Sequence, residues 1–404
     1  MINRLLNPWR LRVYPWAALG TLTVCFLLIL VASPDLITPQ GVPLGGDYLV
    51  FYGVGSLVGA GNYASVFEVS AVNQAQKDAL NKPDLNHFHA WVYPPYTALP
   101  LALLARLPYL PSFLLFTALM AVCSWYAVAL IGRISPFIAH NRGPVFAATL
   151  SFYPLFRAVA GGQNTALSLL LICGATAMAV QRRDGLAGVC LGLLMFKPHF
   201  ALPLIGLALL ARRGKIVAVS ISVAVACGLA AVPFFGWEWP RRWLISVVRY
   251  RQLEGDVNGP NLVSLLGVSE QLLGSGNTLA WAAAALTGIP LILWLCWLFW
   301  SKVARDQLVA ESWAVAAAAL VLLSPHSQFY ELGLLALPMM LLAARQSWNA
   351  AGAILLIWLA AWTHALFHRP LVQPLFFLAV LGFFASLKLL RAPGTPTALP
   401  VAAD

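Results

Sequence analysis

The chain is short of charge. Only 10% of its 404 residues are Asp, Glu, Lys or Arg, whereas 60% are hydrophobic. A soluble protein of this length would need far more polar side chains to cover its surface. Polar stretches long enough to link separate folded units are also lacking. We therefore expect a single membrane-embedded domain over residues 1–392, followed by a short cytoplasmic tail over residues 393–404.

Paired thiol or carboxylate ligands are lacking as well. The six cysteines lie inside apolar stretches without a CxxC pair, and no two acids stand as DxD. These absences argue against a disulfide scaffold, and we expect neither a metal ion nor another cofactor. The formal charge of +11 does not indicate a nucleic-acid partner, because the basic residues form short clusters between apolar runs. Such clusters indicate the cytoplasmic side of a membrane protein.

Apolar sequence is what the chain has in plenty. Its recurrence between basic clusters predicts an all-α polytopic membrane protein with about twelve transmembrane or re-entrant segments. The first run follows Arg4, Arg10 and Arg12 and is longer than a signal-peptide core, so we expect an uncleaved span with a cytoplasmic N-terminus. The predicted segments are 15–33, 112–132, 144–160, 164–180, 186–196, 201–211, 216–235, 277–300, 310–323, 331–344, 350–366 and 371–388.

Residues 186–211 allow two interpretations: one kinked crossing, or a hairpin of two short arms that returns to its own side. A single crossing would move Arg212, Arg213 and Lys215 to the outer side, against the positive-inside tendency, so we predict the hairpin. An arm of about 11 residues spans about 16 Å, well short of the roughly 30 Å hydrocarbon core. The hairpin tip is therefore expected at depth.

This topology brings polar groups to one side. Three tips point outward, and they share that side with Asp47 of the segment GGDYLVFY; they are Gly161–Asn164 (GGQN), Lys197–His199 (KPH) and Ser324–Glu331 (SPHSQFYE). A charged group inside the membrane costs about 2.5 to 3.5 kcal/mol on insertion scales. Because a purely structural membrane protein would not need such groups, we take Asp47 and the tips as the candidate site.

Two outer loops are predicted, 34–92 and 236–276. The first is the longest polar stretch and ends in HFHAWVYPPY, before the short apolar run Thr97–Leu104 that we interpret as re-entrant or interfacial. His87 and His89 of this loop have no acid at a suitable spacing, which disfavours a metal site. The second loop contains WEWPRRWLISVVRYRQL, whose tryptophans and arginines suit a helix lying in the headgroup plane of the membrane lipids.

An acid with cationic and amide groups nearby suits transfer of a sugar from a lipid phosphate to a hydroxyl. One carboxylate can deprotonate the attacking hydroxyl while Lys, Arg and His stabilise the departing phosphate. A phosphate leaves without being protonated as an alcohol would be, so a second acid is not needed. Asp47 alone is therefore a sufficient candidate base.

Five motifs in chain order also resemble glycosyltransferase family 87, over nearly the whole sequence: GGDYLVFYGVGSLVGAGNYASVF, VYPPYTALPLALLARLP, GGQN, LLMFKPHFALPLIGLALLARR and LLSPHSQFYELGLLALP. That family has a C-type glycosyltransferase fold and includes polyprenyl-phosphate-mannose-dependent α-mannosyltransferases. The resemblance implies an inverting transfer of a hexose, with mannose expected, from a polyprenyl-phosphate sugar. The acceptor would be a glycolipid or glycan on the outer face of the cytoplasmic membrane. The segment Asn258–Leu266 departs from the expected Asn and Ser pattern, which leaves acceptor specificity open.

By this resemblance Asp47 is the catalytic base, and Lys197 and His326 bind substrate. The other expected substrate-binding residues are Arg157, Gln163, Asn164, His199 and Glu331.

Each candidate also has a structural interpretation. Asp47 can cap a helix or turn, Lys197 can snorkel, and Arg157 can anchor to lipid. His326 and the Gln163 and Asn164 amides can satisfy hairpin backbone. The rival function is a transporter or lipid flippase, which would favour internal repeats and charges spread through the midplane rather than gathered on one side.

Overall fold

The computed structural model describes residues 8–258, 261–307, 309–366 and 382–390. Within these ranges the chain is helical, with isolated β-bridges and no strand ladder, which confirms the all-α prediction. Most of the predicted segment 371–388 and the whole of the predicted tail 393–404 lie outside the described residues.

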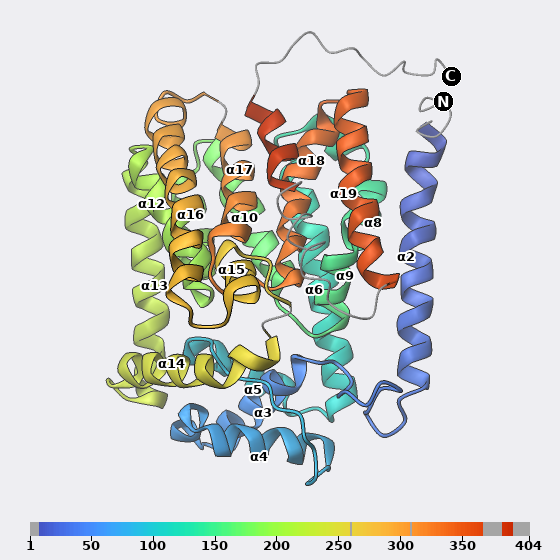
Figure 1. Ribbon diagram of the computed structural model, residues 1–404, viewed down its shortest axis with the longest axis vertical. Helices are drawn as coiled ribbons and strands as arrows, with labels where there is room; N and C mark the ends of the chain where they lie inside the picture. Colours follow the sequence, from blue (N-terminus) through green and yellow to red (C-terminus); the bar gives the residue numbers. More distant parts are fainter. Residues whose placement is uncertain (1–7, 259–260, 308, 367–381, 391–404) are drawn as a thin grey trace.

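Most helices stand side by side along the vertical axis of Figure 1, and a few short ones gather at its lower end. The helices are α2 (Pro8–Val31), α3 (Tyr48–Gly59), α4 (Val69–Leu80), α5 (Ala98–Leu104), α6 (Tyr109–Gly132), α7 (Pro136–His140), α8 (Arg142–Leu150), α9 (Tyr153–Ala160), α10 (Thr165–Val180), α11 (Asp184–Leu193), α12 (Pro198–Leu210), α13 (Gly214–Phe235), α14 (Trp239–Asn258), α15 (Leu265–Leu273), α16 (Thr278–Leu298), α17 (Val309–Leu323), α18 (Ala336–Ala344) and α19 (Trp348–Leu366). Short 3-10 helices add η1 (Tyr63–Phe67), η2 (Pro95–Thr97), η3 (Leu194–Phe196), η6 (Phe329–Leu335) and η7 (Lys388–Leu390), and a short π-helix adds η5 (Phe299–Val303).

The structure does not confirm the predicted count of about twelve transmembrane or re-entrant segments. Among the described residues, 4 helices are long and apolar enough to cross a membrane; these are Trp9–Val31, Tyr109–Gly132, Gly214–Phe235 and Thr278–Val303. The other apolar helices of the described residues have 10 to 17 residues in their apolar parts, and whether any of them is re-entrant stays a prediction. The segment predicted as 144–160 is broken between α8 and α9, where Pro154 enters the first turn of the second helix.

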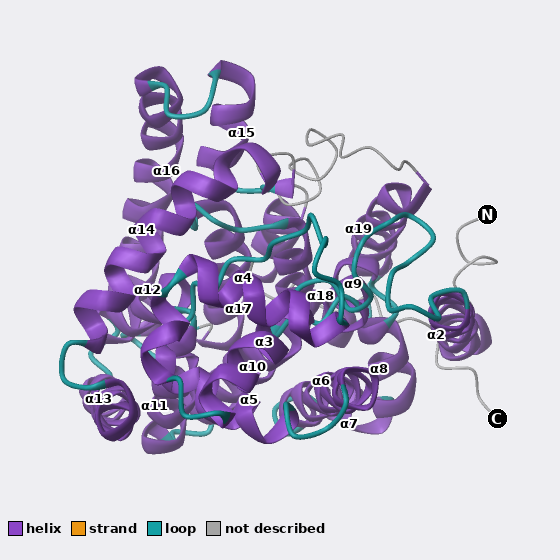
Figure 2. Cartoon of the chain, turned by 90° about the horizontal axis from the view of Figure 1, so that it is seen from below, coloured by secondary structure: helices purple, strands orange, loops and turns teal. Residues whose placement is uncertain are grey.

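The lower end of Figure 1, where α3, α4, α5 and α14 lie, is called the site end below. Helix α14 lies across this end, roughly perpendicular to α13, and Figure 2 shows α3, α4 and α14 in front of the bundle when it is seen from below. Trp243 of α14 donates its indole hydrogen to the carbonyl of Val92 at 3.1 Å, which fastens α14 to the preceding outer loop. Residues 239–258 thus form a helix that lies across the end of the bundle, and its position in the headgroup plane stays a prediction.

The expectation that residues 34–92 form a polar loop was wrong in one respect. The segment contains α3, which is buried along most of its length by α4 and α5. Its 12 residues are too few to span a membrane, so its apolar sequence serves packing at the site end.

The predicted hairpin of residues 186–211 is confirmed by contacts at its two ends. Arg213, just after α12, donates from Nε to Oδ2 of Asp184 at 3.0 Å and from Nη2 to the carbonyl of Ala179 at 2.9 Å. The start of α11 and the end of α12 therefore lie together. Helix α11 also packs closely on α13, because a Cβ at Gly188 would lie 2.7 Å from the carbonyl oxygen of Ile216.

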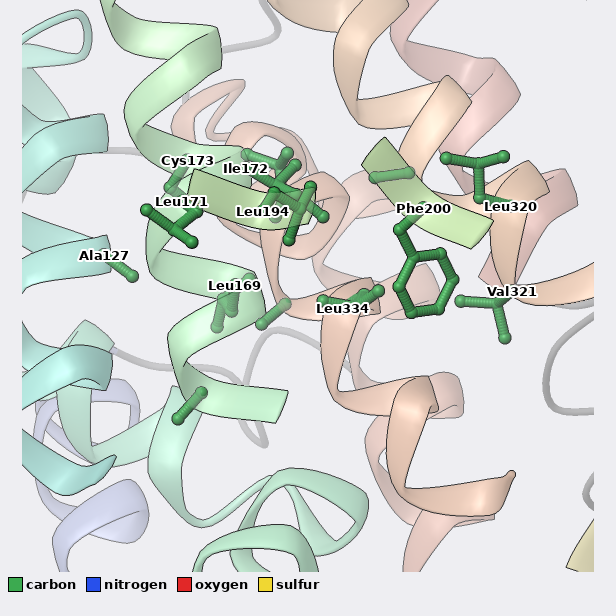
Figure 3. Close-up of a cluster of buried hydrophobic side chains, with 14 of the residues drawn as sticks. Ala127, Leu169, Leu171, Ile172, Cys173, Leu194, Phe200, Leu320, Val321 and Leu334 are labelled. Atoms are coloured by element: carbon green, nitrogen blue, oxygen red, sulfur yellow. The ribbon is translucent and has the colours of Figure 1, made fainter. Parts of the chain in front are cut away.

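Apolar side chains from elements far apart in the sequence meet between the hairpin and the C-terminal helices (Figure 3). The cluster joins α10, η3, α12, α17 and η6 through buried residues that include Leu169, Ile172, Leu194, Phe200, Leu320 and Leu334. Close packing of this kind resists displacement of any one element. It therefore fixes the hairpin tip relative to the segment that follows α17.

Candidate active site

Two glycine pairs bring distant loops into contact at the site end. Gly162 has a φ of +71°, and a Cβ on it would lie 2.3 Å from Cβ of Tyr48 and 2.6 Å from the carbonyl oxygen of Gly45. No other residue fits that space. The backbone N–H of Asp47 donates to the carbonyl of Gly161 at 3.1 Å. The GGD and GGQ segments thus position Asp47 directly beside Gln163.

Both oxygens of the Asp47 carboxylate accept hydrogen bonds from side chains. Nδ1 of His89 lies 2.9 Å from Oδ1, and Nε2 of Gln163 donates to Oδ2. Asp47 occupies the position before α3 but makes no side-chain capping bond, so its side chain does not serve as a helix cap. About 30% of the side chain stays exposed, which leaves it accessible to a substrate.

The environment keeps Asp47 ionised. Burial by itself would raise the pKa of this carboxyl group, but the hydrogen bond and charge of His89, the hydrogen bond of Gln163 and the charge of Arg157 outweigh that effect and hold the pKa below its ordinary value. A carboxyl group with a lowered pKa is deprotonated at neutral pH. Asp47 can therefore accept a proton without first having to lose one.

The KPH and SPHSQFYE tips meet at a buried ion pair. Nζ of Lys197 lies 2.6 Å from Oε1 of Glu331, and the two side chains are 3% and 5% exposed. Oε2 of Glu331 has no hydrogen-bond partner among the described residues. The anionic partner of Lys197 in this structure is thus a carboxylate of the protein itself.

His199 and His326 both lie near this pair. His199 is in the first turn of α12 and lies within electrostatic range of Lys197 and His326. His326 is exposed. The backbone of its segment is held by the second outer loop, since Val263 N–H donates to the carbonyl of Ser327 at 2.8 Å and the Ser264 hydroxyl to the carbonyl of Pro325 at 3.1 Å.

Tyr330 and Tyr93 connect the two groups of polar residues. Nε2 of Gln163 also lies 3.0 Å from the hydroxyl of Tyr330, the residue next to Glu331. The hydroxyl of Tyr93 lies 3.4 Å from the side-chain oxygens of both Gln163 and Asn164. The Tyr93 ring stacks on Phe196, directly before Lys197. The three predicted tips and Asp47 therefore form one connected site.

Arg157 is the exposed cation of this site. It lies in α9, its guanidinium carbon is 5.9 Å from the centroid of the Phe329 ring, and its charge acts on Asp47. An exposed guanidinium whose charge reaches the Asp47 carboxylate is suited to hold a phosphate group.

All eight predicted residues fall in or beside this network. The structure gives Gln163 a contact with the carboxylate rather than with hairpin backbone, which was the structural interpretation of its amide. Sequence reasoning missed His89, Tyr93 and Tyr330. All three lie inside motifs that were noted for other reasons, HFHAWVYPPY and SPHSQFYE.

The arrangement suits one-base group transfer to a hydroxyl. It combines an ionised carboxylate with the exposed guanidinium of Arg157 and the buried ammonium of Lys197, the combination that deprotonates a nucleophile and stabilises an anionic leaving group. Within the described residues, no three His, Cys, Asp or Glu side chains form a group that could hold a metal ion. Independence from metal stays a prediction for experiment.

Comparison with known proteins supplies the family. The model of glycosyltransferase family 87 matches residues 91–325, which is more than half of the chain. The match covers Arg157, Gln163 and Lys197, whereas Asp47 precedes it and His326 follows it. Neither the curated proteins nor the solved structures that were compared give a match. The apolar helices and the family together indicate a membrane protein that transfers a sugar from a donor to an acceptor. The chain belongs to glycosyltransferase family 87 and is a membrane glycosyltransferase.

Proposed function

We propose that this glycosyltransferase moves mannose from a polyprenyl-phosphate donor to a glycolipid or glycan acceptor, with inversion, on the outer face of the cytoplasmic membrane. The observation that carries the proposal is the Asp47 carboxylate, held by His89 and Gln163 and still partly exposed. Membership of a glycosyltransferase family weighs against the transporter or flippase alternative.

In the proposed reaction, Asp47 accepts the proton of an acceptor hydroxyl as that oxygen attacks the anomeric carbon of the donor. A new C–O bond forms on one face of the sugar while the bond to the phosphate oxygen breaks on the other, so the anomeric configuration inverts. Polyprenyl phosphate leaves with the electron pair of the broken bond. The gathering of the polar residues at one end of the bundle supports a lipid-linked donor lying alongside the helices.

Arg157, His326 and Lys197 are the proposed ligands of the donor phosphate. Arg157 and His326 are exposed and need no rearrangement to reach it. An ammonium carries three donors, and Glu331 accepts one of those of Lys197, so this buried cation can act on the phosphate while its charge stays balanced. His199 and Glu331 would support these ligands, and Gln163 and Asn164 would contact the sugar beside Asp47.

The proposed position of the site predicts how single cysteines are labelled in intact cells. Cysteines at positions 47, 163, 197 and 326 are expected to react from the outer side, and both termini from the cytoplasm. Labelling of position 197 from the cytoplasm alone would contradict the proposed orientation.

Purified protein incubated with a panel of polyprenyl-phosphate sugars, each with radiolabelled sugar, tests the donor. We expect label to move from the mannose donor to a lipid-linked acceptor and the activity to survive EDTA, because the phosphate is held by side chains. Transfer from none of the panel, or activity lost to EDTA and restored by Mn²⁺, would overturn the donor or the phosphate assignment respectively.

A further inference from the structure

The backbone of His89 is clamped by a side chain that takes no part in the site described so far. Gln76 of α4 is fully buried, and its Nε2 donates to the carbonyl of His89 at 2.8 Å. Its Oε1 accepts the backbone N–H of the same residue at 3.0 Å. One amide therefore satisfies both backbone groups of His89 and fixes that residue relative to α4.

The ring of His89 faces Asp47 through a defined nitrogen. Nδ1 lies 2.9 Å from Oδ1, and an ionised carboxylate can only accept hydrogen bonds, so Nδ1 carries the hydrogen. Gln163 holds the other oxygen from the opposite segment. With one donor on each oxygen, the carboxylate plane cannot rotate freely, and each oxygen keeps a lone pair for a substrate hydroxyl.

We propose that His89 is a positioning residue for Asp47 and that Gln76 positions His89, so that Gln76, His89 and Asp47 form one chain of hydrogen bonds that aims the carboxylate. This inference rests on the proposed role of Asp47 as base. The hydroxyl proton passes to Asp47, and the Nδ1 hydrogen remains on His89 throughout, so no proton is relayed through the ring. Misdirection of a reacting group by a small distance can lower a rate by a large factor.

The charges around Asp47 make the proposal testable by pH. The groups that act on the carboxylate are His89 from the loop after α4, Arg157 from α9 and the neutral amide of Gln163, which also contacts the Tyr330 hydroxyl. Since His89 lowers the pKa of Asp47, removing it raises that pKa. Activity requires the ionised form, so the acid limb of the pH–rate profile would move to higher pH. A residue that only stabilised the fold would not move this limb.

The test compares His89→Ala, His89→Asn and His89→Gln in the purified full-length protein, with His87→Ala as a control from the same loop. The amide nitrogen of Asn can take the place of Nδ1, whereas that of Gln lies further out. We expect His89→Ala and His89→Gln to lower kcat about tenfold or more with an unchanged KM for the donor, and to move the acid limb upwards. His89→Asn should recover most of kcat and part of the position of the acid limb, because it restores the hydrogen bond but not the charge of His89. His87→Ala should match wild type.

Gln76→Leu tests the contact in this series of hydrogen bonds that is furthest from Asp47, and it leaves the side chains of the site unchanged. We expect a smaller fall in kcat, about threefold to tenfold, with a smaller displacement of the acid limb in the same, upward direction, because the His89 ring is still present. If His89→Ala does not stay monodisperse in detergent, the pair His89→Asn and His89→Gln gives the same comparison. The proposal would be overturned if His89→Asn and His89→Gln had equal activity and the acid limb of both lay where it lies in wild type. Full activity of Asp47→Asn would instead overturn the proposed function, so the two failures are distinguishable.

Discussion

Asp47 at the site end is held differently from three carboxylates at the opposite end of the molecule. At the end opposite the site, Asp184 faces Arg213, Asp306 faces Arg182 and Glu311 faces Arg345. Each of these acids has a permanent cation as partner. At the site end, Asp47 is held by an imidazole and a neutral amide and keeps about 30% exposure. The first arrangement neutralises charge where loops meet, whereas the second keeps a carboxylate oriented and available.

The Lys197 and Glu331 pair combines features of both ends. It is a full ion pair and is more buried than the arginine pairs, yet it lies at the tip of the hairpin, beside the candidate phosphate ligands. Its position predicts a double role, in stability and in donor binding. If the two kinds of carboxylate contact differ in function, substitutions at the site end should lower turnover or donor use, whereas those at the opposite end should lower stability alone.

Lys197→Ala is expected to cause the largest loss of stability, about 3 to 5 kcal/mol, because it leaves the buried Glu331 carboxylate without its partner. Thermal unfolding in detergent measures this. The double variant Lys197→Met with Glu331→Gln removes both charges and should recover most of the stability while donor use stays impaired. A double variant as unstable as Lys197→Ala would show that packing, not charge, accounts for the loss.

Arg213→Ala probes the opposite end. It removes the contacts with Asp184 and Ala179 that join the two ends of the hairpin, and we expect a loss of about 2 kcal/mol. The turnover of the folded fraction should stay within about twofold of wild type, since the site lies at the other end of the bundle. A large loss of turnover in fully folded protein would mean that the hairpin transmits changes to its tip.

His326→Ala is expected to have the smallest effect on stability, within about 0.5 kcal/mol, because the side chain is exposed. If His326 binds the donor phosphate, its removal should raise the KM for the donor about tenfold and leave the KM for the acceptor unchanged. Steady-state kinetics with each substrate varied in turn gives both values. Equal changes in the KM for the donor and the KM for the acceptor would instead favour a role for His326 in shaping the loop.

The hairpin and the meeting of the tips could be predicted from sequence because they follow from charge. The positive-inside tendency keeps Arg212 and Arg213 on the cytoplasmic side, together with the preceding basic cluster. The segment between the two clusters must therefore turn back, and its tip, with Lys197, faces the side of Asp47. The structure agrees at both points, through the contact of Arg213 with Asp184 and that of Lys197 with Glu331. The family could also be named, because its motifs occur in order along the chain.

The partners within the site could not be predicted, because they depend on tertiary structure. Lys197 and Glu331 are 134 residues apart, and Gln163 is 116 residues from Asp47. The position of His89 depends on the Gln76 clamp and on the fold of α3 and α4. Helix α3 itself was missed because an apolar stretch of 12 residues does not have the length of a span, and its burial is decided by neighbouring helices.

The same substitution made at both ends tests the central claim most directly. Asp47→Asn and Asp184→Asn each replace a carboxylate by an amide of nearly equal size, and turnover of purified, monodisperse protein is measured with the mannose donor. We predict that Asp47→Asn lowers turnover at least about a hundredfold with little change in the unfolding temperature, whereas Asp184→Asn lowers the unfolding temperature and leaves turnover near wild type. Near-normal turnover of Asp47→Asn would contradict the assignment of Asp47 as the base.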